Sequence, residues 1–406
     1  IPLAFIMVVM DDKKEIVIHH CISSLYESTG GPAVSVVRLC ESLSQAGICT
    51  TIHTLSLRGY EVANVLPSQN NVKVNFTEGV LVKGLKVYAP FKFKADLYRN
   101  IRGATLLHSH GLWLEVNHIA SRVAKKVNIP LIVSPRGMLE EWSLNHKRLK
   151  KKIAWHLYQK HDLLNAAAFC ATSSQEAEGI RSLGFKQPIA VIPNGVVLPP
   201  VDKLKATEKK YRIALFLSRL SPKKGVIDLI NAWNHLTLNN FPQMASWRLN
   251  IVGPDEGGYK KEILKVISNY QLQNCISVFD PAYGNDKQSL FDEADLFILP
   301  SYSENFGNVI IEALASAVPV ITTKGTPWKE LVDFRCGWWT DVGFDGCVNA
   351  LREALSVSDT TRAEMGIRGR KLVEDKYSWR SVTERMIGFY KWLIERKKMP
   401  DFVRTH

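Results

Sequence analysis

Two glutamates stand in an otherwise apolar stretch at residues 299–323, where they could bind the hydroxyls of a ligand. Apolar residues recur at helical spacing after Gly307, which predicts a strand before the stretch, a loop with Glu304 and a helix with Glu312. The unpaired N–H groups and the dipole at such a helix start favour a phosphate. A carboxylate on each side of this anion site suits a ligand with hydroxyls at both ends and phosphate between them, such as a nucleotide diphosphate sugar.

The loop that opens this helix offers backbone donors to the phosphate. Asn305 begins the turn, and the amides of Phe306, Gly307 and Asn308 follow it. Gly307 has no Cβ, so a ligand can approach the backbone closely. The spacing of the two glutamates leaves a second interpretation open, in which one is a surface acid, the other lies on a helix face, and neither binds a ligand.

A basic loop follows the strand predicted at residues 213–218. Its sequence, RLSPKKG, contains Arg219 and Lys224, which we expect to neutralise a diphosphate, with Lys223 as the less favoured contact. The same charges could serve solubility alone. The chain has no DxD pair of the kind that holds a metal and a diphosphate together, so we expect no metal and no other cofactor.

The first half of the chain predicts a strand, a glycine turn, a helix and a second strand over residues 15–57, an arrangement typical of nucleotide-binding domains. Gly30 and Gly31 form the turn, which reads GGP rather than GxGxxG, so the dinucleotide fingerprint is absent. The two glycines could contact a diphosphate or could simply form a tight turn.

Two further strands end in polar residues at the edge where open α/β sheets bind ligands. His110 follows the strand predicted at 105–109, and Arg136 follows the one at 131–134. The guanidinium of Arg136 could hold a phosphate, whereas the alternatives are a surface arginine and a histidine bonded only to backbone. Trp113 and Glu115 come next after His110 and could border an acceptor pocket.

Several motifs follow one another in a definite order from about residue 15 onward. They are the GGP turn, HSHGLW at 108–113, PNGV at 193–196, RLSPKKG at 219–225, and Glu304-x7-Glu312 between PS and A-x4-P-V. In this order they resemble the retaining GT-B glycosyltransferases of family 4. The resemblance implies an α/β protein of two Rossmann-like, doubly wound domains that face each other across a cleft. The donor would lie mostly on the second domain and the acceptor mostly on the first.

The resemblance also implies roles for single residues. His110 would contact the transferred sugar near the reacting carbon, and from their positions Glu304 would hold the hexose and Glu312 the ribose. Arg219 and Lys224 would stabilise the departing diphosphate. No residue is an obvious nucleophile, and the family retains configuration by attack on the face that the leaving group vacates.

Two departures from the family pattern bear on these roles. Relatives hold the base through backbone groups at the place of Pro281 and Ala282, but the usual glycine of that turn is missing here, which leaves the identity of the base open. The acid that usually ends the hinge motif is replaced by Val197.

Length and charge indicate two domains and an anionic partner. A chain of 406 residues exceeds one ordinary core. We expect a first domain at 13–197 plus 380–406, a linker at 198–210 and a donor domain at 211–379, with residues 1–12 as an extension outside the fold. Seven cysteines without a CxxC pair predict buried free thiols in a reducing compartment. The net charge of +13 is concentrated in the first half.

The sequence HKRLKKK at 146–152 lies in a helix predicted to continue to about residue 165, with aromatic residues between its basic ones. It could be a solvated helix face, an anionic membrane surface could bind it through residues 146–160, or it could bind nucleic acid. The resemblance favours the membrane interpretation, because bacterial members of the family often extend lipid-linked glycans. We therefore expect a cytoplasmic protein that can attach peripherally to the inner face of the membrane.

Together these features predict a metal-independent hexosyltransferase of bacterial envelope, capsule or exopolysaccharide synthesis. The expected donor is a UDP-sugar, with UDP-glucose first, and the expected acceptor is a glycan or a lipid-linked oligosaccharide. Two alternatives stay open. One is another nucleotide-sugar enzyme of the same architecture, such as a UDP-sugar 2-epimerase or a phosphorylase. The other is a basic nucleic-acid-binding protein, which would leave Glu304 and Glu312 unexplained.

Overall fold

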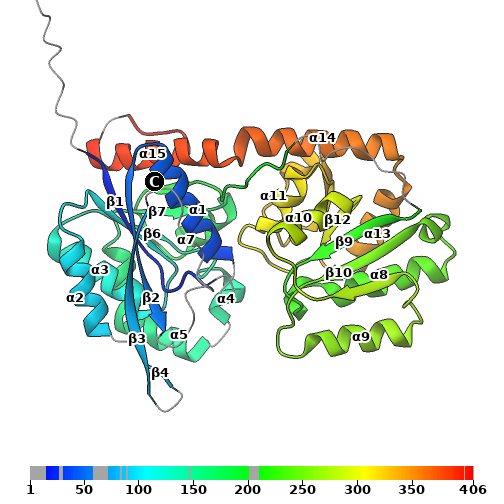
Figure 1. Ribbon diagram of the computed structural model, residues 1–406, viewed down its shortest axis with the longest axis horizontal. Coiled ribbons are helices and arrows are strands. Elements are labelled where there is room, and N and C mark those ends of the chain that lie inside the picture. The colour runs from blue at the N-terminus through cyan, green and yellow to red at the C-terminus, as the bar shows by residue number, and fades with distance from the viewer. Residues whose placement is uncertain are drawn as a thin grey trace, which may run out of the picture. The chain divides into compact units, whose positions relative to one another are not determined.

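The structure is a computed structural model that describes residues 15–26, 31–57, 72–82, 85–87, 90–145, 148–200, 210–396 and 398–405. The chain divides into two compact units. The first comprises residues 1–135, 149–170 and 387–400, and the second comprises residues 136–148, 171–386 and 401–406. Figure 1 labels the elements of both.

Among the described residues, the first sheet has nine strands in the order β15-β8-β7-β6-β5-β1-β2-β3-β4. Their bounds are β1 (Val17–Cys21), β2 (Cys49–Leu57), β3 (Lys73–Val82), β4 (Leu85–Val87), β5 (Leu106–His110), β6 (Leu131–Ser134), β7 (Ala168–Ala171), β8 (Ile189–Val191) and β15 (Val403–Arg404). The strands from β3 across β1 to β7 pair in parallel, and β4 and β15 add antiparallel edges. The strand order reverses between β1 and β5, which is where parallel sheets of this kind leave room for a ligand.

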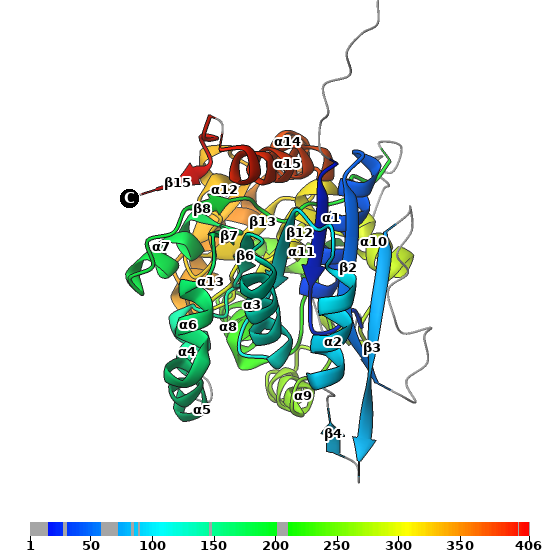
Figure 2. The same cartoon turned by 90° about the vertical axis from the view of Figure 1, so that its left-hand side faces the viewer.

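The helices of the first half follow its strands in alternation. Their bounds are α1 (Gly31–Gln45), α2 (Pro90–Asn100), α3 (Glu115–Val127), α4 (Glu141–Asn145), α5 (Arg148–Ala154), a π-helical turn η3 (Trp155–Gln159), α6 (Lys160–Leu164) and α7 (Ser174–Ser182). Figure 2 shows α2 and α3 side by side, with α6 next to α3. The helix predicted to run to about residue 165 therefore consists of α5, η3 and α6 in succession.

The second sheet has six parallel strands in the order β11-β10-β9-β12-β13-β14. Their bounds are β9 (Arg212–Leu217), β10 (Trp247–Val252), β11 (Ile276–Phe279), β12 (Leu296–Leu299), β13 (Val320–Thr323) and β14 (Gly337–Thr340). This is the 3-2-1-4-5-6 order of a doubly wound sheet, with its reversal between β9 and β12. The side chains of β12 and β13 are buried throughout, as expected for strands that are covered on both faces.

Helices cover this sheet and build its core. Their bounds are α8 (Val226–Leu238), α9 (Tyr259–Asn269), α10 (Gly284–Glu293), α11 (Asn308–Ala315), α12 (Glu330–Asp333), α13 (Phe344–Ser356) and α14 (Asp359–Lys376), with 3-10 turns η5 (Pro222–Lys224) and η6 (Pro242–Ser246). The last helix, α15 (Trp379–Glu395), belongs to the second unit up to Met386 and to the first unit from Ile387 onward. Trp233, Trp247 and Trp328 are fully buried. Burial of such large side chains is a major source of stability, because each removes a large apolar area from water.

The structure confirms the expected fold class, two doubly wound α/β sheets, and corrects two details. The sequence predicted no regular element over residues 58–103, but their described part forms β3, β4 and α2. The apolar alternation there is weak, so periodicity alone does not reveal the strands. The seven cysteines form no disulfide and five of them are buried as predicted, but Cys49, which begins a strand, is exposed and Cys275 is half-buried. The predicted domain boundaries and the linker at 198–210 stay a prediction.

Candidate active site

The second sheet brings two loops together where its strand order reverses. One follows β9 and carries Lys224, and the other follows β12 and carries Glu304. Gly225 joins them closely: its φ is +69°, and a Cβ at this position would lie 2.2 Å from the carbonyl oxygen of Pro300. Only glycine allows this approach, so the packing of the two loops requires Gly225, while the two lysines before it supply charge.

Lys224 and Glu304 form an ion pair in which the Lys224 ammonium donates a hydrogen bond to Oε1 of Glu304. Only 10% of the Lys224 side chain and 13% of the Glu304 side chain is exposed. Ser301 Oγ also donates to Oε1 of Glu304 at 2.8 Å, and the Glu304 amide donates to the carbonyl of Gly325 at 2.9 Å. Both charges are therefore fixed in position beside the loop that opens α11.

The helix α11 begins where the sequence predicted an anion site. Gly307 precedes it with a φ of +80°, and Asn308 is its first residue. Phe306 is buried, and its carbonyl accepts a hydrogen bond from the indole of Trp328. Since an L side chain is strained at such a φ, Gly307 sets the direction in which the free amides at the helix start point.

Asn194 connects Arg136 to the first residue of α11, all within the second unit. Arg136 Nη1 donates to Asn194 Oδ1 at 3.0 Å, and Asn194 Nδ2 donates to Asn308 Oδ1 at 2.8 Å. Asn305 Nδ2 donates to Thr172 Oγ1 at 2.9 Å. The PNGV motif gives no signal in the sequence that its asparagine lies between two predicted site residues.

Two carboxyl groups near this site were not predicted, the buried Glu176 and the half-buried Glu140. Glu176 accepts hydrogen bonds from the amides of Gly137 and Thr172 at 2.6 and 2.7 Å. Burial, together with the negative charge of Glu176, raises the pKa of Glu140 to about 7, although Ser303 donates a hydrogen bond to it. Glu140 is therefore poised to exchange a proton near neutral pH.

The remaining donor residues lie in separate environments. The side chain of Arg219 is 60% exposed and pairs with Glu256 at 2.9 Å. Glu312 lies on α11 and pairs with Lys287 at 2.6 Å. Lys223, which we expected to be the less favoured contact, places its ammonium 4.2 Å from the ring centroid of Trp142, and burial lowers its pKa.

The other predicted donor contacts lie at loops or helix ends. Pro281 is exposed and Ala282 is half-buried in the loop after β11. Gly31 is the exposed first residue of α1, and Gly30 lies outside the described residues. The structure shows where these residues are, and their contacts with a donor stay predictions.

In the first unit, His110 belongs to a cluster of three buried histidines. His20 and His108 are register partners in the adjacent parallel strands β1 and β5, so they share one face of the sheet with His110, two residues further on. The rings of His108 and His110 stack with centroids 4.1 Å apart. Tyr390, on α15, bonds through its hydroxyl to His108 Nδ1 at 2.7 Å.

Three imidazoles this close could ligate a metal, since their ring nitrogens lie within 4.8 Å of one another. However, the two ring nitrogens of His108 already bond to Tyr390 and to Ser134 Oγ, at 2.7 and 2.8 Å. The cluster fits a hydrogen-bonded histidine network better than a metal centre. His20 and His108 were missed at the sequence level, although the H-x-H spacing on a strand places two histidines on one face.

The two acceptor-side candidates follow the same strand. Trp113 has a φ of +70° and is held by two hydrogen bonds, one from its amide to Gln159 Oε1 at 2.7 Å and one from the Tyr158 hydroxyl to its carbonyl at 2.8 Å. Glu115 is exposed in the first turn of α3. In the part of the chain that the structure describes, no helix has the length and apolar character needed to cross a bilayer.

The chain is similar in sequence to known glycosyltransferases and in fold to solved structures. CapM of Staphylococcus aureus, a capsular polysaccharide biosynthesis glycosyltransferase, is 25% identical over 49% of this chain, and the match spans about half (52%) of its own length. The GDP-mannose:cellobiosyl-diphosphopolyprenol alpha-mannosyltransferase of Xanthomonas campestris is 22% identical over 95% of this chain and 99% of its own. The structure of Anabaena HepE in complex with UDP-glucose matches with a TM-score of 0.71 at 16% identity, covering 92% of this chain and 99% of that one.

Two family models together account for most of the sequence. The model for Glycosyltransferase Family 4 matches residues 29–198, and the model for Glycosyl transferases group 1 matches residues 202–372. The second match contains the Lys224 loop and the start of α11, and the first contains His108 and His110 of the histidine cluster. The chain therefore belongs to the group 1 glycosyltransferases of family 4, retaining enzymes of the GT-B fold.

Proposed function

We propose that the protein transfers a hexose, with retention, from a UDP-sugar to a glycan acceptor in bacterial envelope, capsule or exopolysaccharide synthesis. UDP-glucose is the first candidate donor. The observation that carries the proposal is the buried Lys224–Glu304 pair beside the N-terminus of α11. It combines a cation and helix amides for a diphosphate with a carboxylate for sugar hydroxyls.

The relatives support the donor class and leave its base to be measured. HepE has been seen in complex with UDP-glucose, and the Xanthomonas relative is described as using GDP-mannose on a diphosphopolyprenol acceptor. Both donors are nucleoside diphosphate sugars, for which the same phosphate chemistry serves. An acceptor of polyprenol-linked saccharide is part of our proposal, in line with the predicted lipid-linked glycan.

In the proposed reaction, the bond between the anomeric carbon and the diphosphate oxygen breaks, and the acceptor oxygen bonds to that carbon on the same face. The acceptor proton passes to an oxygen of the leaving phosphate. Lys224, Arg219 and the amides at the start of α11 stabilise the charge that grows on the diphosphate. Such electrostatic stabilisation is usually the largest single contribution to a rate enhancement. No metal is required, because these groups carry the neutralisation.

The sugar-side roles complete the proposal. Glu304 accepts hydrogen bonds from hexose hydroxyls, and Glu312 accepts them from the ribose. His110 contacts the transferred sugar, and Gly30 and Gly31 contact the diphosphate. Arg136, which Asn194 connects to the first residue of α11, is a further phosphate contact.

The helix that follows α4 is proposed to dock on an anionic membrane. Leu149, Ile153 and Leu157 recur every four residues and are 78%, 61% and 75% exposed. Lysines occupy positions 150–152 between them. Exposed apolar side chains on one face of a basic helix are typical of a helix that lies in the membrane interface.

The first experiment is a melting-temperature series with UDP, GDP and ADP, followed by a transfer assay with the matching donor sugar. A shift with one diphosphate identifies the base, and product on a polyprenol-linked saccharide establishes transfer. Conversion of the UDP-sugar to an epimer without any acceptor would contradict the transferase and identify an epimerase instead.

A further inference from the structure

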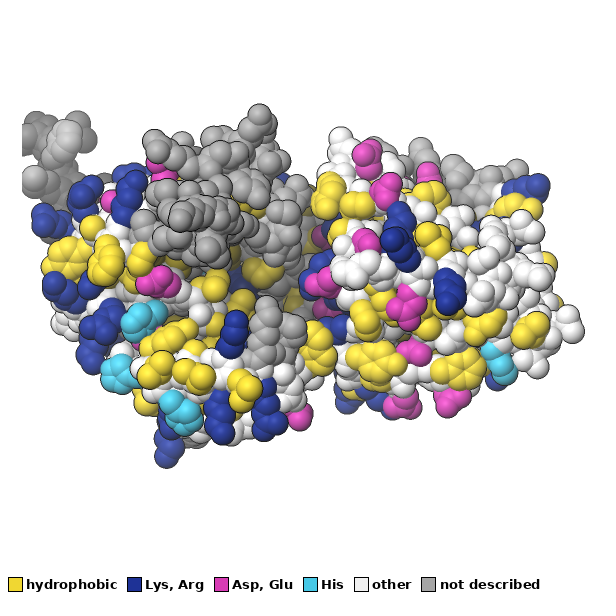
Figure 3. Space-filling view, turned by 90° about the horizontal axis from the view of Figure 1, so that it is seen from below, with side chains coloured by type: hydrophobic (Ala, Val, Ile, Leu, Met, Phe, Trp, Pro, Cys, Tyr) yellow, Lys and Arg dark blue, Asp and Glu magenta, His cyan; other side chains and the backbone are white. Residues whose placement is uncertain are grey.

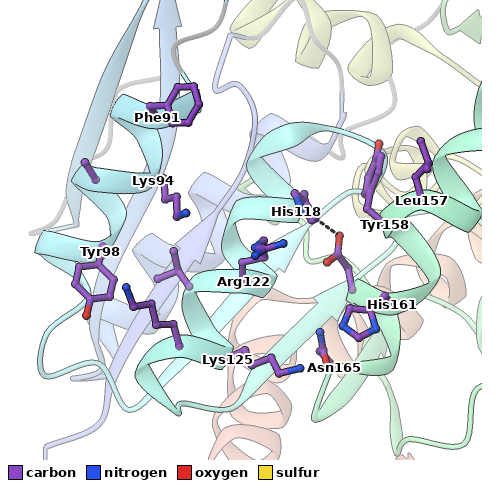
Figure 4. A pocket seen from close by; sticks show the side chains of 14 residues that line it. Phe91, Lys94, Tyr98, His118, Arg122, Lys125, Leu157, Tyr158, His161 and Asn165 are labelled. Atoms are coloured by element: carbon purple, nitrogen blue, oxygen red, sulfur yellow. Dashed lines mark hydrogen bonds and ion pairs between the residues drawn. The ribbon is translucent and has the colours of Figure 1, made fainter.

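A groove of about 760 Å³ lies in the first unit between α2, α3 and the stretch from Leu157 to Asn165. Figure 4 shows Phe91, Lys94 and Tyr98 on one wall, His118 and Arg122 on α3, and Tyr158 and His161 on the other wall. Apart from Leu157 and Tyr158, which belong to the stretch proposed to dock on a membrane, the residues that line the groove are part of no motif that the proposed function uses. All of its lining residues belong to the first unit, so its shape depends on that unit alone.

The lining of the groove carries a strong excess of positive charge. Its permanent cations are Lys94, Arg122, Lys125 and Lys126, and Asp162 is the one acid among its lining residues. Asp162 accepts a hydrogen bond from His118 Nδ1 at 2.8 Å, so one oxygen of its carboxylate is engaged by that ring. Lys126 stays near the surface of Tyr98, with its ammonium 4.9 Å from the ring centroid. A groove with this balance is complementary to an anion with several oxygen atoms.

The rim of the groove is apolar and unusually exposed. Phe91 on α2 is 86% exposed and Leu157 on the opposite wall is 75% exposed. Leu149 and Ile153 continue this surface along α5. Figure 3 shows hydrophobic side chains of the first unit interspersed with lysines, arginines and histidines. A free phosphate in water would explain the cations but not this rim.

A bilayer explains both features. Apolar side chains enter the boundary between headgroups and acyl chains, while lysine and arginine meet the phosphates just above it. We propose that this groove binds the headgroup phosphate of an anionic phospholipid, so that one lipid molecule is held between α2 and α3 while Phe91 and Leu157 dip into the bilayer. This inference rests on the membrane docking in the proposed function and adds a defined lipid site to it.

A lipid bound in this groove would place the membrane near the strand end that carries His110. The helix α3 begins five residues after His110, and the groove follows it from His118 to Lys126, over about 12 Å at the rise of an α-helix. A lipid bound there holds the membrane along the flank of the same unit that carries the histidine cluster. An acceptor attached to a membrane lipid then starts close to the strand end that bears His110.

The test compares three charge-reversed double variants in co-sedimentation with vesicles of phosphatidylcholine that contain about one third phosphatidylglycerol. Arg122→Glu with Lys125→Glu changes the groove. Lys150→Glu with Lys152→Glu removes the same charge from α5, on the same surface but outside the groove. Each of these four residues is exposed, so the folded state tolerates the change.

A third pair, Lys261→Glu with Lys265→Glu, makes the same change on exposed positions of α9 in the second unit. We expect the groove pair to weaken vesicle binding more than tenfold, because its residues would contact the lipid phosphate directly. The α5 pair should weaken binding several-fold less, because its lysines act only through the general attraction to the anionic surface. The α9 pair, in the second unit, should change binding less than about twofold. Binding to phosphatidylcholine alone should be weak for every protein.

Equal losses from the groove and α5 pairs would mean diffuse attraction without a lipid site, and unchanged binding of the groove pair would also overturn the proposal. So would tighter, salt-sensitive binding of wild type to DNA than to the vesicles. The UDP-induced rise in the melting temperature of wild type is measured separately. Its absence together with a selective loss in the groove pair would contradict the proposed donor chemistry and leave the lipid site standing.

Discussion

His20 Nδ1 lies 3.0 Å from His110 Nε2, and the two rings are stacked with an interplanar angle of 9°. The residues come from β1 and β5, which are 90 positions apart in the sequence and adjacent in the sheet. Because one of the two nitrogens must donate to the other, the tautomers of His20 and His110 are coupled, and the contact fixes the two rings relative to each other. The residue that we expect to contact the sugar is thus positioned by a neighbour that no motif marks.

Removing this neighbour should affect catalysis more than folding. We expect His20→Asn to lower kcat about three- to tenfold, since a hydrogen bond contributes about 0.5–1.5 kcal/mol. The donor KM should change less. Steady-state kinetics with the identified donor measures both.

His19 provides the matched control, because it is the adjacent buried histidine on the opposite face. It pairs with His53 at 2.8 Å, and burial lowers the pKa of His19 to about 4. His19→Asn should leave kcat unchanged at comparable stability. An equal loss of kcat in both variants would show that His20 acts only through the fold.

The Lys224–Glu304 pair predicts separate effects on stability and turnover. Lys224→Ala should lower kcat by about 10² or more if the ammonium stabilises the departing diphosphate. It should also destabilise the fold by about 3 kcal/mol or less, because it leaves the largely buried Glu304 carboxylate without its cation. Transfer kinetics and urea unfolding measure the two effects.

A double variant separates them. Lys224→Ala with Glu304→Gln removes the uncompensated charge and should recover much of the stability while kcat stays low. Lys223→Ala, one position earlier, is the control for loop charge and should change kcat much less. Recovery of kcat along with stability would mean that Lys224 has no part in the chemistry.

The raised pKa of Glu140 predicts a pH dependence of folding. Its pKa is about 7 in the folded state against an ordinary value of 4.5, mainly through burial and then through the charge of Glu176. The folded state therefore binds the proton more tightly, so the free energy of unfolding falls as pH rises from about 4.5 to 7. The size of this contribution is on the order of 1–3 kcal/mol.

Chemical unfolding of wild type and Glu140→Gln at several pH values between 5 and 8 measures it. The amide cannot ionise, so the variant should lose this part of the pH dependence and gain stability relative to wild type at pH 8. Parallel curves for the two proteins would show that Glu140 does not titrate in this range.

Glu312 should control the affinity for the nucleotide. A ligand at about a hundred times its dissociation constant adds about 2.7 kcal/mol to stability, which a melting curve detects. We expect Glu312→Ala to abolish the shift produced by the preferred diphosphate. Lys287→Ala removes the ion-pair partner and leaves the carboxylate, so its shift should be close to that of wild type. A full shift in Glu312→Ala would exclude a ribose contact.

The sequence by itself determined the order and type of most elements and the main functional loops. The positions of Gly307 and Lys224 in loops after strands could be predicted, because a strand, a turn and a helix start are local features that short sequence patterns describe well. The predicted bounds of β6, 131–134, agree with the structure, and those of β5 and β9 differ from it by one residue at each end, because each is a regular apolar segment between clear turn residues.

Only the tertiary structure decided which distant residues meet. The bridge through Asn194, the raised pKa of Glu140 and the pairing of His20 with His110 each join residues separated by many positions. The groove between α2 and α3 likewise needs a helix from the stretch where sequence periodicity was too weak to show one. Local patterns indicate which side chains share a face of a strand or helix. The burial of a group and its hydrogen-bond partners depend on every element packed around it, so they are decided only when the elements pack together.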